Sequence, residues 1–219
     1  MSQSVLLAIL GLPGTGKGTQ GSLLSEVLGK PYFATGDLVR EIVKSRKKDR
    51  FTRSIQKRYL KGIPQPDQVI NKIVKRKVES LIERNGLIVD AYPLSMGQVK
   101  GLEKLVRDHQ IQHFWVIYLD VEQKEIIRRL SSRRICKKCR ASIVYTGQEE
   151  RCVCGGKLVL RDDDKPMVVK TRIREYRKRF KHILKYYRDR SELIRINGNQ
   201  SIAAVHTDIM NELRGRGVF

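Results

Sequence analysis

The segment at the start of the chain constrains the fold most. Six apolar residues, 5–10, run directly into GLPGTGKGT at residues 11–19. A buried strand followed by a glycine-rich turn, a lysine and a hydroxyl residue is typical of a loop whose backbone N–H groups surround phosphate groups. A glycine-rich turn that binds nothing is the alternative, and Lys17 argues against it because it adds a positive charge at the place of the β- and γ-phosphates. We therefore predict a phosphate-binding loop whose nucleotide contacts come from Gly14, Thr15, Gly16, Lys17, Gly18 and Thr19.

Four further apolar runs alternate with helix-like segments along the 219 residues. They lie at residues 31–34, 87–89, 114–119 and 193–196. Strands separated by helices imply right-handed crossovers and a parallel sheet that is covered on both faces. The predicted fold is therefore α/β, a five-stranded parallel sheet of the P-loop NTPase type with helices on both faces.

Two segments interrupt this alternation. Residues 36–65 are helical in pattern and basic, and residues 132–164 are rich in glycine, cysteine and charge. We expect both to be insertions at the carboxyl edge of the sheet, where ligands bind in open α/β folds. The expected core then consists of residues 1–35, 66–131 and 165–219.

All four cysteines lie in the second insertion, as Cys136, Cys139, Cys152 and Cys154. Two close pairs can converge on one tetrahedral ion, and thiolates suit zinc. The second pair has only one intervening residue, so a substitute ligand or an empty site is the alternative, and disulfides are disfavoured in a reducing compartment. We predict a structural zinc knuckle, in which four protein ligands leave no open position for catalysis.

The charge balance is strongly basic, with 45 Lys and Arg against 23 Asp and Glu and a formal net charge of +22. Such a field attracts polyanions, so non-specific affinity for nucleic acid is expected without being required for function. The chain has no apolar stretch long enough to cross a bilayer and no signal-peptide pattern, so we expect a cytoplasmic protein without a membrane partner. We also expect a monomer.

Several motifs together resemble the adenylate kinase family, in its long-lid form with a zinc-binding lid. The resemblance runs nearly end to end, through residues 11–20, ATGDLVR at residues 34–40, two arginines before the cysteines and RDDD at residues 161–164. It implies that residues 36–65 form a monophosphate-binding insertion and residues 132–164 a lid. It also implies phosphoryl transfer between ATP and AMP, with Mg²⁺ accompanying the nucleotide.

The resemblance implies roles for single residues as well. Lys17, Arg129, Arg133, Arg161 and Arg172 would be catalytic, with Arg129 also at ATP, while Thr35, Arg40, Gln98, Arg161 and Arg172 would bind substrate and Asp90 would hold magnesium through water. Cationic side chains suit phosphoryl transfer, because this reaction needs dense charge neutralisation in a site that excludes water. The planar fork of arginine suits phosphate oxygens especially well.

The acceptor site departs from the family pattern. Leu94 stands where the family has an arginine that grips the AMP phosphate, and Gln65 stands where a small apolar residue is usual. Three interpretations follow: AMP remains the acceptor with another cation, such as Lys100, as replacement; a different nucleoside monophosphate is preferred; or the protein binds ATP without efficient transfer. We favour AMP.

A function of another class, a P-loop ATPase that binds nucleic acid through its zinc knuckle and basic surface, also fits the motifs. Aromatic residues make up only 6% of the chain. A dedicated single-strand binder is expected to carry more stacking surface.

Overall fold

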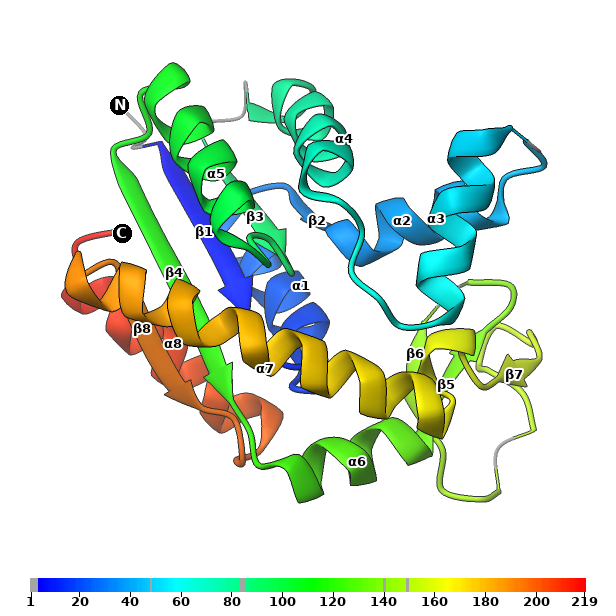
Figure 1. Cartoon of the computed structure of the whole chain (residues 1–219). Coiled ribbons are helices and arrows are strands. Elements are labelled where there is room, and N and C mark those ends of the chain that lie inside the picture. Colours follow the sequence, from blue (N-terminus) through cyan, green and yellow to red (C-terminus); the bar gives the residue numbers. More distant parts are fainter. Residues whose placement is uncertain (1–3, 48, 83–85, 140, 149) are drawn as a thin grey trace.

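A central sheet of five parallel strands organises the molecule, in the order β2-β3-β1-β4-β8 (Figure 1). The computed structural model describes residues 4–47, 49–82, 86–139, 141–148 and 150–219. The strands are β1 (Val5–Leu10), β2 (Tyr32–Ala34), β3 (Gly86–Asp90), β4 (His113–Asp120) and β8 (Leu193–Asn197). The predicted α/β fold is confirmed, and each strand ends within one residue of the apolar run that predicted it.

Strand β1 is buried along its whole length. Leu6, Ala8 and Leu10 belong to one hydrophobic core, and the alternate residues of the strand belong to a second core. Successive side chains of a strand point to opposite faces, so an unbroken apolar run requires cover on both sides of the sheet.

Two layers of helices provide this cover. Helices α1 (Lys17–Leu28) and α8 (Ile202–Gly215) pack on one face, and α4 (Asp67–Glu79), α5 (Met96–Asp108) and α7 (Pro166–Asp189) pack on the other. Helix α7 begins with Pro166 at its first turn, where the missing N–H costs no hydrogen bond. Its buried residues include Val169, Ile173, Phe180 and Tyr187, at the spacing of one helical face.

The two segments that interrupt the alternation lie on the same side of the central sheet (Figure 1). The first contains α2 (Thr35–Lys44) and α3 (Arg50–Leu60), and Asp49 caps α3 by accepting a hydrogen bond from the Thr52 N–H at 2.7 Å. The second follows α6 (Gln123–Ser132) and forms an antiparallel sheet of β5 (Arg133–Cys136), β6 (Ser142–Val144) and β7 (Leu158–Val159). A 3₁₀ helix, η2 (Asp162–Asp164), then leads into α7 and lies against α3. Both segments therefore meet beside the carboxyl ends of the core strands.

Among the described residues, no helix combines the length and the apolar character needed to cross a membrane.

Candidate active site

The glycine-rich loop connects β1 to α1 and folds around the side chain of Lys17. Gly16 precedes the helix with a φ of 94°, a left-handed conformation that glycine adopts without steric cost. The Lys17 ammonium donates hydrogen bonds to the carbonyl oxygens of Gly11 (3.0 Å) and Leu12 (2.9 Å). Burial lowers the pKa of Lys17 to about 8, although the nearby Asp90 carboxylate opposes this shift. Lys17 is therefore held in the loop by groups that a phosphate can replace.

One cavity of about 490 Å³ extends from this loop to α2, α3 and the small sheet. Gly14, Gly16, Lys17, Gly18 and Thr19 line it on the side of the loop. Thr15 does not line it, because its hydroxyl donates to the Leu12 carbonyl oxygen at 2.9 Å and supports the loop from within. Five cations face the same cavity, namely Lys17, Arg40, Arg133, Arg161 and Arg172.

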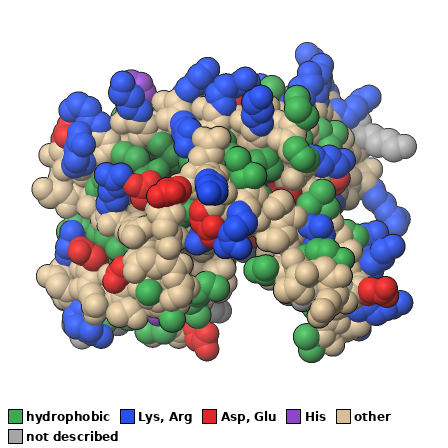
Figure 2. All heavy atoms as spheres, turned by 90° about the horizontal axis from the view of Figure 1, so that it is seen from below, with side chains coloured by type: hydrophobic (Ala, Val, Ile, Leu, Met, Phe, Trp, Pro, Cys, Tyr) green, Lys and Arg blue, Asp and Glu red, His purple; other side chains and the backbone are tan. Residues whose placement is uncertain are grey.

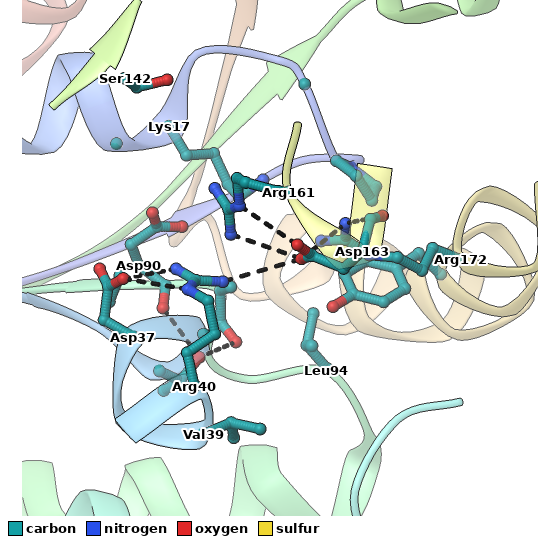
Figure 3. Close-up of a pocket in the computed structure, with 18 of the residues that line it drawn as sticks. Lys17, Asp37, Val39, Arg40, Asp90, Leu94, Ser142, Arg161, Asp163 and Arg172 are labelled. Carbon is teal, nitrogen blue, oxygen red and sulfur yellow. Dashed lines mark hydrogen bonds and ion pairs between the residues drawn. The ribbon is translucent and has the colours of Figure 1, made fainter. Parts of the chain in front are cut away.

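Two buried carboxylates hold the four arginines in place. Asp163 lies 3.2 Å from Arg161, 2.9 Å from Arg172 and 3.8 Å from Arg40. Figure 3 shows Arg40 and Arg161 reaching this carboxylate from different parts of the chain. Its neighbour Asp164 pairs with Arg133 through contacts of 2.7 and 2.5 Å. The arginines are thus oriented before any ligand is bound.

The ion pairs also fix the charge of Asp163. Burial alone would raise the pKa of this carboxyl group, but Arg172, Arg161 and Arg40 outweigh burial and hold the pKa below its usual range. Asp163 is therefore ionised at neutral pH. A phosphate that enters the cavity would compete with a carboxylate for guanidinium groups that are already in position.

Asp90 ends β3 beside the loop, and only one of its oxygens has a partner. The Tyr32 hydroxyl donates to Oδ2 at 3.1 Å, whereas Oδ1 is buried without a hydrogen-bond partner in the described part of the chain. Burial raises the pKa of Asp90, and Lys17 opposes the rise. A buried carboxylate oxygen without a partner fits a magnesium ion held through water, because Mg²⁺ favours oxygen ligands and retains several waters.

The far part of the cavity is less charged and contains two glutamines. The amide of Gln98 is occupied within the chain, since Oε1 accepts from the Leu94 N–H at 2.7 Å and Nε2 donates to Asp67 at 3.0 Å. Gln65 is buried, and its Nε2 donates to the Ile55 carbonyl oxygen at 3.1 Å. Among the described residues its Oε1 has no partner. Gln65 therefore keeps one acceptor oxygen that is buried and unpaired at the cavity wall.

The surroundings of Leu94, Lys100 and Arg129 bear on the roles expected of them from the sequence. Leu94 lines the cavity below Asp163 (Figure 3), and its carbonyl oxygen accepts from Arg179 at 3.3 Å. Lys100 is exposed on α5 and does not line the cavity, so the structure offers no support for it as a replacement cation. Arg129 also lies outside the lining, because it bonds to Glu125 (2.6 Å) and to the Gly198 carbonyl oxygen (2.9 Å).

Comparison with known proteins agrees with this geometry. The sequence profile of the family described as "Adenylate kinase" matches residues 9–192. The chain is 34% identical over 215 residues to "Adenylate kinase" of Thermosipho africanus, with 95% of this chain and 99% of that protein covered. It is 35% identical to the protein of the same name from Caldicellulosiruptor saccharolyticus (94% and 98% covered) and 36% identical to that from Methanocella arvoryzae (94% and 97%). The chain belongs to the adenylate kinase family.

The cysteine cluster is a second candidate site in this member of the adenylate kinase family. The Sγ atoms of Cys136, Cys139, Cys152 and Cys154 all lie within 4.8 Å of one another, and none is in a disulfide. Two Sγ pairs, 136/154 and 139/152, are 3.4 and 3.6 Å apart. Four thiolates at Zn–S bonds of about 2.3 Å have similar separations, so the donor set fits zinc. The backbone N–H of Cys139 lowers the pKa of the Cys136 thiol to about 6.

Sequence reasoning missed several side chains of this adenylate kinase cavity. Tyr32, Tyr59 and Tyr176 line it, and Asp163, which the sequence showed only as part of the RDDD motif, connects Arg40 to Arg161. No motif marks the tyrosines, because they come from a strand and two helices that only tertiary folding brings together. The pairing of Asp37 with Arg40 at 2.5 Å was detectable, since acidic and basic residues three apart face each other on a helix.

Proposed function

We propose that this chain transfers the γ-phosphoryl group of ATP to AMP and releases two ADP. The observation that carries the proposal is one cavity that extends from the glycine-rich loop to the apolar side chains around Leu94, with five cations in its lining. Two nucleotides that meet there with their phosphates together would place the transferred group among Lys17 and the arginines.

The residues supply positioning and charge, and none needs to form a covalent bond. Gly14, Gly16, Gly18 and Thr19 would surround the donor phosphates, and Lys17 would move from the loop carbonyls to phosphate oxygens. Bound magnesium would neutralise charge on the ATP phosphates, and Asp90 would hold it through water. Arg133, Arg161 and Arg172 would exchange their carboxylate partners for phosphate oxygens. Because their guanidinium groups are already oriented, they would stabilise the transition state at little reorganisation cost.

The cavity lining supports AMP as the acceptor, and one observation keeps a second candidate in view. Arg40 and Thr35, which belong to α2, and Gln98 all line the cavity. Leu94 contributes no charge there, so Arg40 would be the main cation for the acceptor phosphate. The Oε1 of Gln65 is buried without a partner among the described residues, and if nucleotide binding exposed it, the amino group of adenine, cytosine or guanine could each donate to it. Phosphorylation of another amino-bearing nucleotide is therefore the second candidate.

An acceptor screen tests the proposal. With ATP and magnesium, AMP should give the highest kcat/KM among AMP, CMP, UMP, GMP and their deoxy forms, measured as ADP formation. A higher kcat/KM for CMP or GMP would favour the second candidate. ATP hydrolysis that RNA stimulates and AMP does not affect would instead favour a nucleic-acid-dependent ATPase.

We further propose that the cysteine cluster holds one structural zinc ion. The converging thiols support this, as does the lack of a core: among the described residues of 132–164 the buried hydrophobic side chains are those of Cys136 and Cys152, and such a segment gains its stability from the metal. Metal analysis of the purified protein should find about one zinc per chain. Metal-free protein with four titratable thiols would overturn the assignment, and iron in the same amount would change the ion.

A further inference from the structure

The two helical faces of the central sheet differ in charge. Helices α4, α5 and α7, which cover one side of the central sheet, together carry sixteen Lys and Arg against six Asp and Glu. Helices α1 and α8, on the other side, carry two against three. The central sheet therefore has one basic and one near-neutral helical face.

Helix α7 carries the most regular part of this charge. Seven exposed cations occupy it at the spacing of a single helical face: Lys170, Arg174, Arg177, Lys178, Lys181, Lys185 and Arg188. At about 100° per residue they fall within an arc of about 100°, and every residue from 170 to 188 in that arc is basic. At a rise of about 1.5 Å per residue the row is about 27 Å long. We call these seven residues the α7 row.

Most of the α7 row has no carboxylate partner. Arg174 pairs with Glu175, and Lys185 and Arg188 pair with Asp189. Lys170, Arg177, Lys178 and Lys181 have no ion pair with any described residue. Like charges at neighbouring positions of a helix repel each other, so the row is destabilising by itself and gains from an external anion.

The neighbouring helix continues the basic surface. On α5, which packs beside α7, Lys100, Lys104 and Arg107 are exposed at the same kind of spacing. On α4, which packs beside α5, Lys72, Lys75 and Arg76 are exposed. In the view of Figure 2, Lys and Arg side chains are spread over much of the visible face, with smaller groups of Asp and Glu among them.

We propose that the face formed by α4, α5 and α7 binds the phosphate backbone of RNA without sequence preference. A straight row of about 27 Å is long enough to contact several backbone phosphates of an RNA duplex. On these three helices His182 is exposed, but every Phe and Tyr side chain is buried or half-buried, so the face contacts backbone phosphates and not stacked bases. Met167 is the one large exposed apolar side chain on them. Insertion into a membrane surface requires an apolar face, so RNA fits this surface better than an anionic membrane does.

The face is separate from the candidate active site. Arg172 and Tyr176 line the cavity from the opposite side of α7, and no member of the α7 row lines it. Changes in the row can therefore be made without touching the groups assigned to phosphoryl transfer.

The experiment compares two variants that each lose four positive charges. One is Lys170→Gln, Arg177→Gln, Lys178→Gln and Lys181→Gln in the α7 row. The matched control is Arg46→Gln, Lys47→Gln, Arg53→Gln and Lys57→Gln, four exposed cations of residues 45–60. Affinity for a fluorescein-labelled 20-base-pair RNA is measured by anisotropy in 50 to 200 mM KCl, and phosphoryl transfer and thermal melting confirm that the α7 variant is folded.

The wild-type protein should bind this RNA with an affinity that falls as salt rises. The α7 variant should lose at least tenfold in affinity and reduce the slope of log K against log salt by up to about 3.6, since each phosphate contact contributes about 0.9. The control should change affinity less than threefold. Equal losses in both variants, or no binding by the wild type at 50 mM KCl, would overturn the proposal. Binding that depends on the α7 row but occurs only with anionic lipid vesicles would also overturn it, in favour of a membrane.

A measurement on the wild-type chain keeps the proposal testable if the α7 variant does not fold. Bound RNA should protect Lys170, Lys178, Lys181 and Lys185 from an amine-reactive label and leave Lys47 and Lys57 reactive. Uniform protection, or none, would contradict a defined face.

Discussion

At the residue scale, Lys17 links the phosphate-binding loop to pH. Its folded pKa of about 8 lies below the ordinary value of 10.5, chiefly because it is buried. Lys17 is therefore cationic below pH 8 and loses its charge as pH rises through 8. We expect kcat/KM for ATP to fall above pH 8, approaching tenfold per pH unit, because this parameter reports the ionisation of the free enzyme.

The control for this prediction is Lys17→Arg. Arginine stays charged through this range, so the variant should be less active but should lose the alkaline decline. A wild-type profile that is flat to pH 9.5 would show that the charge of Lys17 does not limit ATP use.

Tyr32 positions the carboxylate assigned to magnesium. Its hydroxyl donates to one oxygen of Asp90 and leaves the other free. Tyr32→Phe should lower kcat/KM about tenfold and raise the magnesium concentration needed for half-maximal activity, because a hydrogen bond to a charged group contributes about 1.5–3 kcal/mol.

Gly21 provides an independent check of that role. A Cβ at Gly21 would lie 2.3 Å from the Tyr32 ring, so Gly21→Ala should displace the ring and produce the same change in magnesium dependence. Unaltered magnesium dependence in both variants would limit Tyr32 to a packing role.

A change at Leu94 tests the departure from the family pattern at the cavity wall. Leu94→Arg should lower KM for AMP by up to about tenfold with little change in KM for ATP, because it adds a cation to the wall below Asp163. The nearby Arg179 would repel the new guanidinium and reduce the gain. Leu94→Met is the uncharged control, and a gain for CMP or GMP without one for AMP would favour a different acceptor.

At the element scale, the small sheet β6-β5-β7 depends on the cysteine cluster. Gly156 lies so close to Cys136 that a Cβ would approach its Sγ to 2.5 Å, and the four Sγ atoms lie within 4.8 Å of one another. Removal of zinc by a chelator should therefore lower Tm and expose residues 133–159 to protease while the central sheet stays folded.

The matched control changes a residue beside the cluster and not a ligand. Cys139→Ser should reproduce the effect of chelation, and Lys137→Gln should not. A chelator that leaves both Tm and cleavage unchanged would contradict a structural metal.

The helices show why charge alone did not locate a partner. The basic residues of α7 were recognisable from the sequence, but the near-neutral charge of α1 and α8 became meaningful only once the two groups of helices were placed on opposite faces.

At the scale of the whole molecule, the net charge of +22 and the five-cation cavity act on ATP over different distances. The screening length is about 8 Å at 0.15 M salt, so remote surface charges contribute little and the cavity dominates. We expect kcat/KM for ATP to fall more steeply with KCl than kcat/KM for AMP, because ATP carries more charge.

The fourfold α7 variant supplies the control, since its row lies outside the cavity. It should retain the wild-type salt dependence for ATP between 0.15 and 0.4 M KCl. A strongly reduced dependence would mean that the surface, and not the cavity, attracts the nucleotide.

Local sequence patterns determined the five strands, the phosphate-binding loop and the paired cysteines. An unbroken apolar run such as residues 5–10 is buried on both faces wherever it pairs, and a glycine-rich turn followed by Lys17 fixes its own backbone geometry. These features depend on neighbours in the chain, so they are readable without the fold.

Tertiary structure decided which charged and polar groups meet. Arg133 faces the cavity and Arg129, four residues earlier, bonds to Glu125 and Gly198 instead. Asp163 joins α2 to α7 through Arg40 and Arg172, and Gln65 keeps a free oxygen because its amide nitrogen is engaged by Ile55. Ion pairs and hydrogen bonds act over a few ångströms between residues far apart in sequence, so only packing of the elements settles which of them form.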